Sequence, residues 1–263
     1  MTPAEIQKTG DSLFLAEQSR KSRGLISVEY PNATMEDAYS TQAKFVARKV
    51  AQGRKIIGWK IGLTSRAMQN QLGIETPDSG ILLDDMAFEN NAVIPSDRFI
   101  APRIEAEIAF VMKASLSGEV SRAQVLAATE YVTPALEILD TRILRSDSAG
   151  NMRSVIDTIA DNAANAGIVT GLMRHLPGID LRWIGAIVSR DGIVEETGLG
   201  AGVLNDPVTG IIWLTKRLSQ YGQAISPGEI ILSGSFIRAI ECPSGCTIVA
   251  DYGPFGTLSC KFA

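Results

Sequence analysis

The chain of 263 residues holds one histidine and three cysteines, and both scarcities narrow the chemistry it can perform. Because His175 lies in a turn-like segment, acid–base work falls to carboxylates, lysine, tyrosine or metal-bound water. Cys242, Cys246 and Cys260 leave an odd thiol, which disfavours a disulfide framework. Cys242 and Cys246 are spaced loosely like metal ligands, but no second Cys or His pair accompanies them. We expect core or surface thiols rather than a zinc site.

The sequence also lacks long apolar runs and any excess of basic charge. No uninterrupted apolar stretch reaches the roughly 18 residues that a membrane-spanning helix needs. The formal net charge is −4 and the basic residues are scattered, which argues against a nucleic-acid surface. The first residues carry neither the basic nor the apolar region of a signal peptide. We therefore expect a globular cytoplasmic protein without nucleic-acid or membrane partners.

What the sequence does contain begins with helical signals over about its first fifty residues. Thr34 and Asp37 have the spacing of a capping box, and apolar residues then recur at helix-like intervals up to Gly53. Strand signals dominate from Lys55 onward. We predict an α+β fold with an N-terminal helical region, residues 1–54, and a β-rich domain, residues 55–263, built on mixed or antiparallel sheet.

Individual elements are predicted from the same patterns. The expected strands cover residues 56–61, 103–111, 229–232, 246–251 and 257–262, and Asp191-Gly192 predicts a hairpin within residues 183–198. The expected helices cover residues 65–72, 121–131 and 207–221, the last opened by Pro207. Residues 198–202 are rich in glycine but lack the spacing of a nucleotide-binding loop, so we expect a turn there.

Two carboxylates stand two residues apart in the apolar run that follows Arg103. In a strand, Glu105 and Glu107 point to one face while the apolar residues between and beyond them pack the other. Glu137 sits in a similar apolar run. Three carboxylates gathered out of water need a cation or a proton, and an all-oxygen set suits Mg²⁺ or Mn²⁺. The alternative is a one-sided strand whose glutamates face solvent.

Lys60 and Asp78 are two further ionisable residues in unusual surroundings. Lys60 lies in an apolar strand, where a lysine can snorkel to solvent. Held near a metal, however, its pKa would fall and its neutral amine could move protons. Asp78 has Pro77 before it and Gly80 after it, so on its own it is typical of a turn.

Several short blocks, taken in order, resemble one protein family nearly end to end. The blocks are GWKIGLT (58–64), PDSG (77–80), PRIEAE (102–107), PALE (134–137) and DNAA (161–164). They resemble the 2-keto-4-pentenoate hydratase and 4-oxalocrotonate decarboxylase family, within the fumarylacetoacetate hydrolase superfamily. Within that family, residues 157–167, 180–184 and 195–205 are most similar to the branch of 2-oxo-hept-4-ene-1,7-dioate hydratases. The segment 142–153 also suits that branch.

The resemblance implies roles for five residues. Glu105, Glu107 and Glu137 would hold Mg²⁺, with Mn²⁺ as the alternative metal, and Lys60 and Asp78 would transfer protons. It also implies a β-rich catalytic domain preceded by helices, a small-molecule 2-oxo acid substrate and a homo-oligomer. Association with a sister enzyme of the same pathway is a further expectation.

The implied activity is Mg²⁺-dependent hydration of a 2-oxo-alkenoate or its 2-hydroxydienoate tautomer, above all 2-oxo-hept-4-ene-1,7-dioate, in meta-cleavage breakdown of aromatic compounds. The alternatives are a 4-oxalocrotonate-type decarboxylase, a 2-hydroxypenta-2,4-dienoate hydratase, and a non-enzymatic partner or scaffold subunit. Hydrolytic C–C cleavage ranks lower, because it needs a His–Glu pair and His175 lies outside the matched blocks. A distal substrate carboxylate would need an arginine, for which Arg153 is the first candidate and Arg142 and Arg145 are others.

Overall fold

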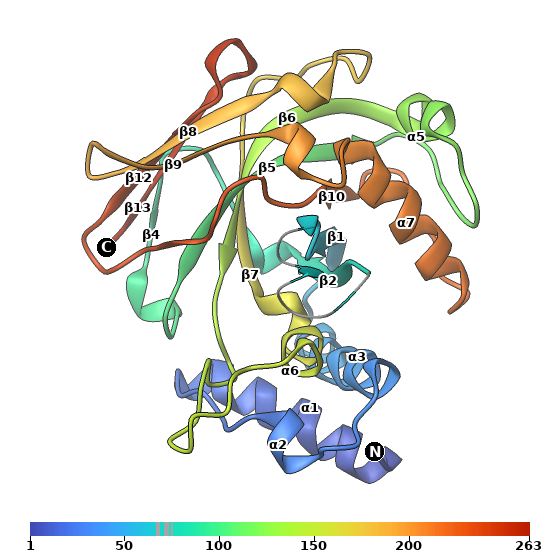
Figure 1. The fold of residues 1–263 in the computed structure, drawn as a ribbon, viewed down its shortest axis with the longest axis vertical. Coiled ribbons are helices and arrows are strands. Elements are labelled where there is room, and N and C mark those ends of the chain that lie inside the picture. The colour runs from blue at the N-terminus through green and yellow to red at the C-terminus, as the bar shows by residue number, and fades with distance from the viewer. Residues whose placement is uncertain (67–68, 71–73, 75) are drawn as a thin grey trace.

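A computed structural model describes the chain from Met1 to Ala263 apart from residues 67–68, 71–73 and 75. Two β-sheets form the body of the molecule, and the N-terminal helices gather with α6 (Val155–Ala160) at one end of it (Figure 1). Helices and mixed sheets together confirm the predicted α+β class. Half of the helix expected at residues 65–72, namely residues 67–68 and 71–72, lies outside this description.

The N-terminal segment folds as its helical signals predict, into α1 (Pro3–Ser19), α2 (Ile26–Glu29) and α3 (Met35–Ala51). The capping box is present: the Asp37 N–H donates to Thr34 Oγ1, and the Thr34 N–H donates to the Asp37 carboxylate. α1 packs closely on α3, since a Cβ at Gly10 would lie 2.5 Å from Lys44 Cβ. Whether residues 1–54 form a separate domain stays a prediction.

The larger sheet carries the strands that matter most for function. Its strands, in order across the sheet, are β2 (Asp78–Leu83), β1 (Ile56–Gly62), β10 (Ile230–Leu232), β5 (Arg103–Met112), β6 (Thr129–Leu139), β7 (Asn165–Thr170) and β3 (Ala87–Phe88), and β11 (Ile240–Glu241) also pairs with β5. β1 and β10 run parallel, as do β3 and β7, while the other neighbours are antiparallel. The sheet is therefore mixed, as predicted.

The second sheet contains the predicted hairpin. Its order is β4 (Ala92–Ile94), β13 (Thr257–Phe262), β12 (Thr247–Asp251), β8 (Gly185–Arg190) and β9 (Ile193–Leu199). Asp191 and Gly192, which join β8 to β9, both have positive φ, 53° and 82°. That backbone matches the right-handed twist of paired strands, which is why the Asp-Gly pair is a strong hairpin signal.

Two predicted boundaries were wrong. The helix expected at residues 121–131 is α5 (Arg122–Ala128), and Thr129 already begins β6, because pairing with β5 extends as far as Met112. The strand expected from Trp183 begins at Gly185, since residues Leu181–Trp183 form a 3₁₀ turn capped by Asp180. α7 (Pro207–Ser219) begins as predicted, with Asp206 accepting from the Val208 N–H at 3.0 Å.

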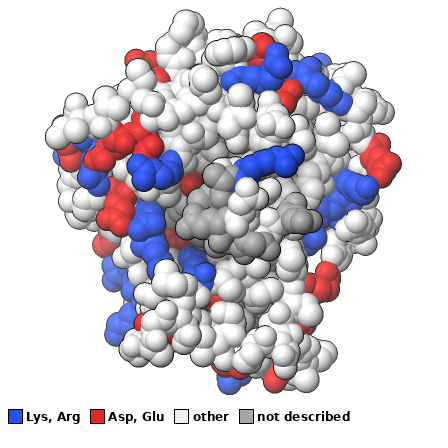
Figure 2. Space-filling view, viewed as in Figure 1, with Lys and Arg blue, Asp and Glu red and all other residues white. Residues whose placement is uncertain are grey.

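The surface bears charge of both signs. On the face drawn in Figure 2, basic and acidic side chains are interspersed rather than separated into fields. The cysteines are buried free thiols, consistent with the core-thiol expectation. Within the described ranges, no helix has the length and apolarity to cross a bilayer.

Candidate active site

The three predicted metal ligands converge where β5 and β6 lie side by side. Glu105 and Glu137 are direct partners across these antiparallel strands, and Glu107 follows on the same face of β5. One carboxylate oxygen from each lies within 4.8 Å of the others. Glu107 is 1% exposed and Glu137 is 0% exposed, whereas Glu105 is half-buried. The solvent-facing alternative is therefore wrong for Glu107 and Glu137.

The hydrogen bonds around these carboxylates leave room for a cation. Glu107 Oε2 accepts from the Gly234 N–H at 2.7 Å, and Glu137 Oε1 accepts from Asn165 Nδ2 at 2.7 Å. Their other oxygens, Glu107 Oε1 and Glu137 Oε2, are buried without a hydrogen-bond partner. Buried carboxylate oxygens that accept no hydrogen bond are costly, and an all-oxygen set is what Mg²⁺ prefers. The donor set therefore fits a divalent cation.

Electrostatics points the same way. Burial, reinforced by repulsion from Glu137, raises the pKa of Glu105 to about 8. The same two causes raise the pKa of Glu107 well above its ordinary value. Carboxylates packed this closely cannot all stay ionised unless a positive charge compensates them. In the described part of the chain, this is the group of three acidic, Cys or His side chains whose ligand atoms lie close enough together to share one metal ion.

Lys60 points from β1 into the carboxylate cluster rather than to solvent. Its Nζ lies 3.3 Å from Glu137 Oε2 and donates to the Ala163 carbonyl at 3.1 Å, and the residue is 3% exposed. The snorkelling alternative is wrong. Burial alone would lower the pKa of Lys60, but the nearby carboxylates, Glu137 and then Asp78, outweigh burial and raise it. The lowered pKa expected from the sequence would require a cation to offset those carboxylates.

Asp78 opens β2 opposite Gly62 of β1 and is 1% exposed, so its turn-forming interpretation is wrong. Its Oδ1 has no hydrogen-bond partner. Burial raises the pKa of Asp78, although attraction to Lys60 opposes the rise. A Cβ at Gly62 would lie 2.2 Å from Asp78 Oδ1 and 2.9 Å from Lys60 Nζ. Glycine is thus required for these two side chains to approach each other.

The acceptor for Lys60 lies in an unusual turn that begins at Asp161. Asn162, Ala163 and Ala164 all have left-handed backbone, with φ of 54°, 51° and 61°. The Asn162 side chain pins the turn to β2, accepting from the Ile81 N–H at 2.8 Å and donating to the Ile81 carbonyl at 2.9 Å. Left-handed backbone is costly for alanine, so neighbouring contacts must hold it. Sequence reasoning matched this block but missed its contact with Lys60.

The three arginines proposed for a distal substrate carboxylate are each bound to other groups of the protein. Arg153 binds Asp161 Oδ2 at 2.5 Å and Thr141 Oγ1 at 3.0 Å. Arg142 is 1% exposed and also binds Asp161, while Arg145 donates to the Ala101 carbonyl at 3.1 Å. Of the described residues, these arginines are not among those that line the cleft at Glu105.

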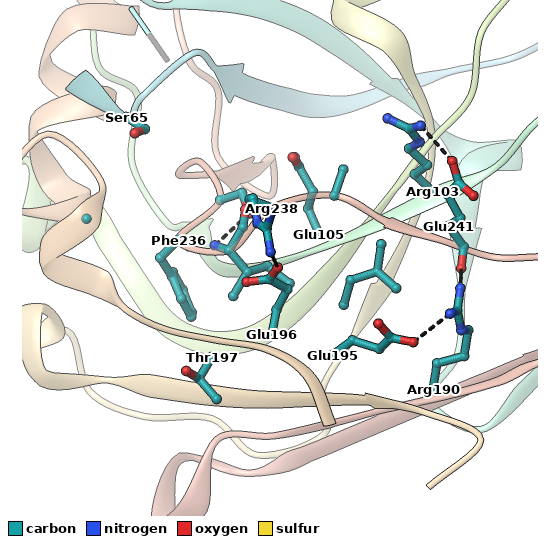
Figure 3. A pocket seen from close by; sticks show the side chains of 15 residues that line it. Ser65, Arg103, Glu105, Arg190, Glu195, Glu196, Thr197, Phe236, Arg238 and Glu241 are labelled. Atoms are coloured by element: carbon teal, nitrogen blue, oxygen red, sulfur yellow. Dashed lines mark hydrogen bonds and ion pairs between the residues drawn. The ribbon is translucent and has the colours of Figure 1, made fainter. Parts of the chain in front are cut away.

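That cleft has a volume of about 840 Å³ and places Glu105 within reach of solvent (Figure 3). Such a volume is ordinary for a small-molecule site. Apart from Glu105, the charged residues that line it form three ion pairs: Arg103 with Glu241, Arg190 with Glu195 and Arg238 with Glu196. Sequence reasoning assigned no role to these pairs. The sequence did contain one indication, because the two-residue spacing of Arg103 and Glu105 places them on the same face of a strand.

Comparison with known proteins places the chain in a family. It is 48% identical over 250 residues to 2-oxo-hept-4-ene-1,7-dioate hydratase of Escherichia coli, covering 94% of both chains. It is 36% identical over 264 residues to 2-keto-4-pentenoate hydratase of Paraburkholderia xenovorans (strain LB400), covering 100% of this chain and 96% of the relative. No model in a scan of protein-family models matches.

A solved structure agrees with these relatives. The 4-oxalocrotonate decarboxylase from Pseudomonas putida G7, complexed with magnesium and adipate, superposes with a TM-score of 0.94 at 33% identity, covering 100% of this chain and 99% of that one. The fold thus belongs to one known class of enzyme. The chain belongs to the 2-keto-4-pentenoate hydratase and 4-oxalocrotonate decarboxylase family, as its sequence blocks predicted.

Proposed function

We propose that this protein is a Mg²⁺-dependent hydro-lyase that adds water to a 2-oxo-alkenoate or its 2-hydroxydienoate tautomer, with 2-oxo-hept-4-ene-1,7-dioate as the preferred substrate. The observation that carries the proposal is the convergence of Glu105, Glu107 and Glu137 beside Lys60. The relative at 48% identity, named for that hydratase activity, supports the substrate class. The reaction belongs to meta-cleavage catabolism of aromatic compounds.

Each charged side chain has a part in the proposed reaction. Glu105, Glu107 and Glu137 would hold Mg²⁺, with Mn²⁺ as an alternative. The bound metal supplies Lewis-acid stabilisation of the negative charge that develops on the head of a 2-oxo acid. Lys60 and Asp78, both buried beside the carboxylates, would pass protons between the substrate oxygen, its carbon chain and the incoming water. Gly62 leaves open the space beside which both side chains lie.

Decarboxylation of a 4-oxalocrotonate-type substrate is the second candidate, favoured by the TM-score of 0.94 to a decarboxylase. Both reactions pass through an enolate, so the same carboxylates and lysine serve either one. Hydration additionally needs water beside C4 of the substrate, whereas decarboxylation needs the leaving carboxylate out of the plane of the developing enolate. The choice between them therefore depends on the outer wall of the pocket. Hydration of 2-hydroxypenta-2,4-dienoate is a narrower alternative within the hydratase class.

The test is turnover by the isolated protein with Mg²⁺ on a panel of 2-hydroxydienoates and 4-oxalocrotonate, with product mass separating water gain from CO₂ loss. We expect water gain, fastest on the seven-carbon dioate. Faster CO₂ release from 4-oxalocrotonate would favour the decarboxylase. A lack of turnover on the whole panel would leave the partner or scaffold role.

Assembly and location are also proposed rather than established. We propose a cytoplasmic homo-oligomer that acts on a small-molecule 2-oxo acid and associates with a sister enzyme of its pathway. Membership of this family supports these expectations. Light scattering of the purified chain, alone and mixed with a decarboxylase of the family, measures both kinds of assembly. A monomer that does not bind the sister enzyme would contradict them.

A further inference from the structure

The three arginines of the cleft differ in how firmly the protein holds them. Glu241 links two of them, because Arg103 donates to its carboxylate at 2.7 Å and Arg190 donates to its carbonyl at 2.9 Å. Arg190 also pairs with Glu195 at 2.6 Å, and the side chains of Arg103 and Arg190 are 32% and 30% exposed. Both guanidinium groups are thus bound to the wall of the cleft, although Arg103 Nε has no hydrogen-bond partner.

Arg238 is held far less. Its side chain is 86% exposed, and its recorded ion pair is with Glu196, which is 18% exposed. Figure 3 shows the Arg238 and Glu196 side chains meeting within the cleft that Glu105 also lines. Because the Arg238 end of this pair is exposed to solvent, a competing anion can reach its guanidinium without displacing other contacts of the cleft wall. Arg238 is the cleft arginine that is available to a ligand.

The segment that carries Arg238 also supports the carboxylate cluster. Residues 233–238 follow β10 and run beside β5, with the Ser233 N–H donating to the Ile108 carbonyl at 3.2 Å. The Gly234 N–H holds Glu107 at 2.7 Å. Phe236 packs edge-on against Tyr252, whose hydroxyl accepts from the Glu107 N–H at 3.1 Å. The backbone of this segment is thus fixed relative to Glu107, although the Arg238 side chain itself is exposed.

We propose that Arg238 binds the distal carboxylate of a dicarboxylate 2-oxo acid and that Glu196 is the resting counter-ion that this carboxylate displaces. The inference rests on the proposed function, because it assumes that the keto-acid head occupies the carboxylate cluster. A ligand with an anionic group at each end would then span from the cluster to Arg238. The sequence-based proposal gave this role to Arg153, but Thr141 and Asp161 already bind its Nη1 and Nη2, and Arg153 is not among the described residues that line the cleft.

The first test compares Arg238→Gln with Arg153→Gln on two substrates that share a head group. These are the seven-carbon dioate and 2-hydroxypenta-2,4-dienoate, which lacks the distal carboxylate. For Arg238→Gln, the ratio of kcat/KM for the dioate to that for the monoacid should fall about tenfold or more, mainly through KM. Arg238→Lys should recover part of the ratio. Arg122→Gln, which removes an exposed arginine paired with Asp206 outside the cleft, is the matched control.

The second test uses the counter-ion. Glu196→Gln removes the anion that competes with the substrate, so it should lower KM for the dioate severalfold while changing the monoacid much less. If the ion pair were only structural, Glu196→Gln would not lower KM, because Arg238→Gln and Glu196→Gln would then impair the enzyme alike. Calorimetric titration with 2-oxoheptanedioate and 2-oxoheptanoate, in the presence of Mg²⁺, supplies a binding measurement that does not depend on turnover.

The outcomes separate this inference from the proposed function. If wild-type protein hydrates both substrates but Arg238→Gln leaves their ratio unchanged, the inference about Arg238 is wrong and the hydratase proposal stands. If Arg153→Gln alone lowers the ratio, the distal carboxylate belongs to Arg153. If wild-type protein hydrates neither substrate, the proposed function itself fails, and preferential binding of the dicarboxylate in the calorimeter then decides the role of Arg238.

Discussion

The inner end of the site and its mouth use the same kinds of charged residue under opposite conditions. At the inner end, Lys60, Asp78, Glu107 and Glu137 are each at most 3% exposed. At the mouth, the arginines of the three ion pairs have side chains 30% to 86% exposed. Charges interact strongly out of water and weakly in it. The inner end therefore suits chemistry in which the catalytic groups must keep fixed positions. The mouth suits substrate recognition by side chains that can be replaced without loss of the fold.

The largest expected effect comes from removing the cation that the inner end is built to hold. Chelator should abolish activity, and Mg²⁺ should restore it. Glu107→Gln should reduce kcat by more than about 10³-fold, since it removes one ligand charge where the transition state needs fixed electrostatic support. Calorimetric Mg²⁺ titration should show weakened binding in a folded protein. Glu119→Gln, which alters an exposed pair with Lys216, is the control. Full activity in excess chelator would disprove the metal assignment.

The next effect concerns Lys60. Lys60→Ala and the bulkier Lys60→Met should both lower kcat by about 10² to 10⁴-fold, the usual scale of general acid–base catalysis, while retaining fold and Mg²⁺ binding. Lys49 offers a matched control, because it is also a buried lysine, 4% exposed, paired with Glu17 at 2.7 Å between the N-terminal helices. Lys49→Met should reduce thermal stability and leave kcat nearly intact. If Lys60→Met retains a near-normal rate, Lys60 only compensates Glu137.

A smaller loss should follow from filling the space between Lys60 and Asp78. Gly62→Ala would place a methyl group 2.2 Å from Asp78 Oδ1, so the two side chains must separate. Misplacement of catalytic groups by about 1 Å costs on the order of 10²-fold in rate, and we expect a loss of about 10 to 10²-fold in kcat. Gly178→Ala is the control, since a Cβ there meets nothing within 4 Å. An unchanged kcat for Gly62→Ala would show that this approach of Lys60 and Asp78 is not needed.

The sequence predicted the inner end better than the mouth, for physical reasons. Strand periodicity places Glu105 and Glu107 on one face whatever the rest of the fold does, and Asp191-Gly192 determines its hairpin locally. The local pattern around Asp78 wrongly indicated a turn, because only pairing with β1 makes Asp78 the start of a strand. Such pairing depends on tertiary context that no local pattern contains.

The turn at Asp161 and the mouth were beyond sequence reasoning for related reasons. Three successive non-glycine residues in left-handed backbone contradict local preference, and contacts such as Asn162 with Ile81 hold them there. At the mouth, Arg238 and Glu196 lie on separate segments that only the fold brings together. The DNAA block was matched to the family, but nothing in the sequence revealed that its Ala163 carbonyl accepts a hydrogen bond from Lys60.

The smallest expected effect is a dependence on salt that should distinguish mouth from inner end within one experiment. Dissolved ions screen charges in contact with water, with a Debye length of about 10 Å at about 0.1 M, but they do not enter a buried cluster. Raising NaCl from about 0.03 M to about 0.5 M at constant Mg²⁺ should therefore raise KM for the dioate about two- to fivefold and change kcat by less than about twofold. The rise is modest because salt also weakens the pair of Arg238 with Glu196, which competes with the substrate.

The monoacid 2-hydroxypenta-2,4-dienoate serves as the control, since its head meets only the inner end. The same KM increase for both substrates would mean that salt acts at the head group, and a fall in kcat would mean that the inner end is open to ions; either result would contradict the division of the site into a sealed chemical end and an exposed recognition end.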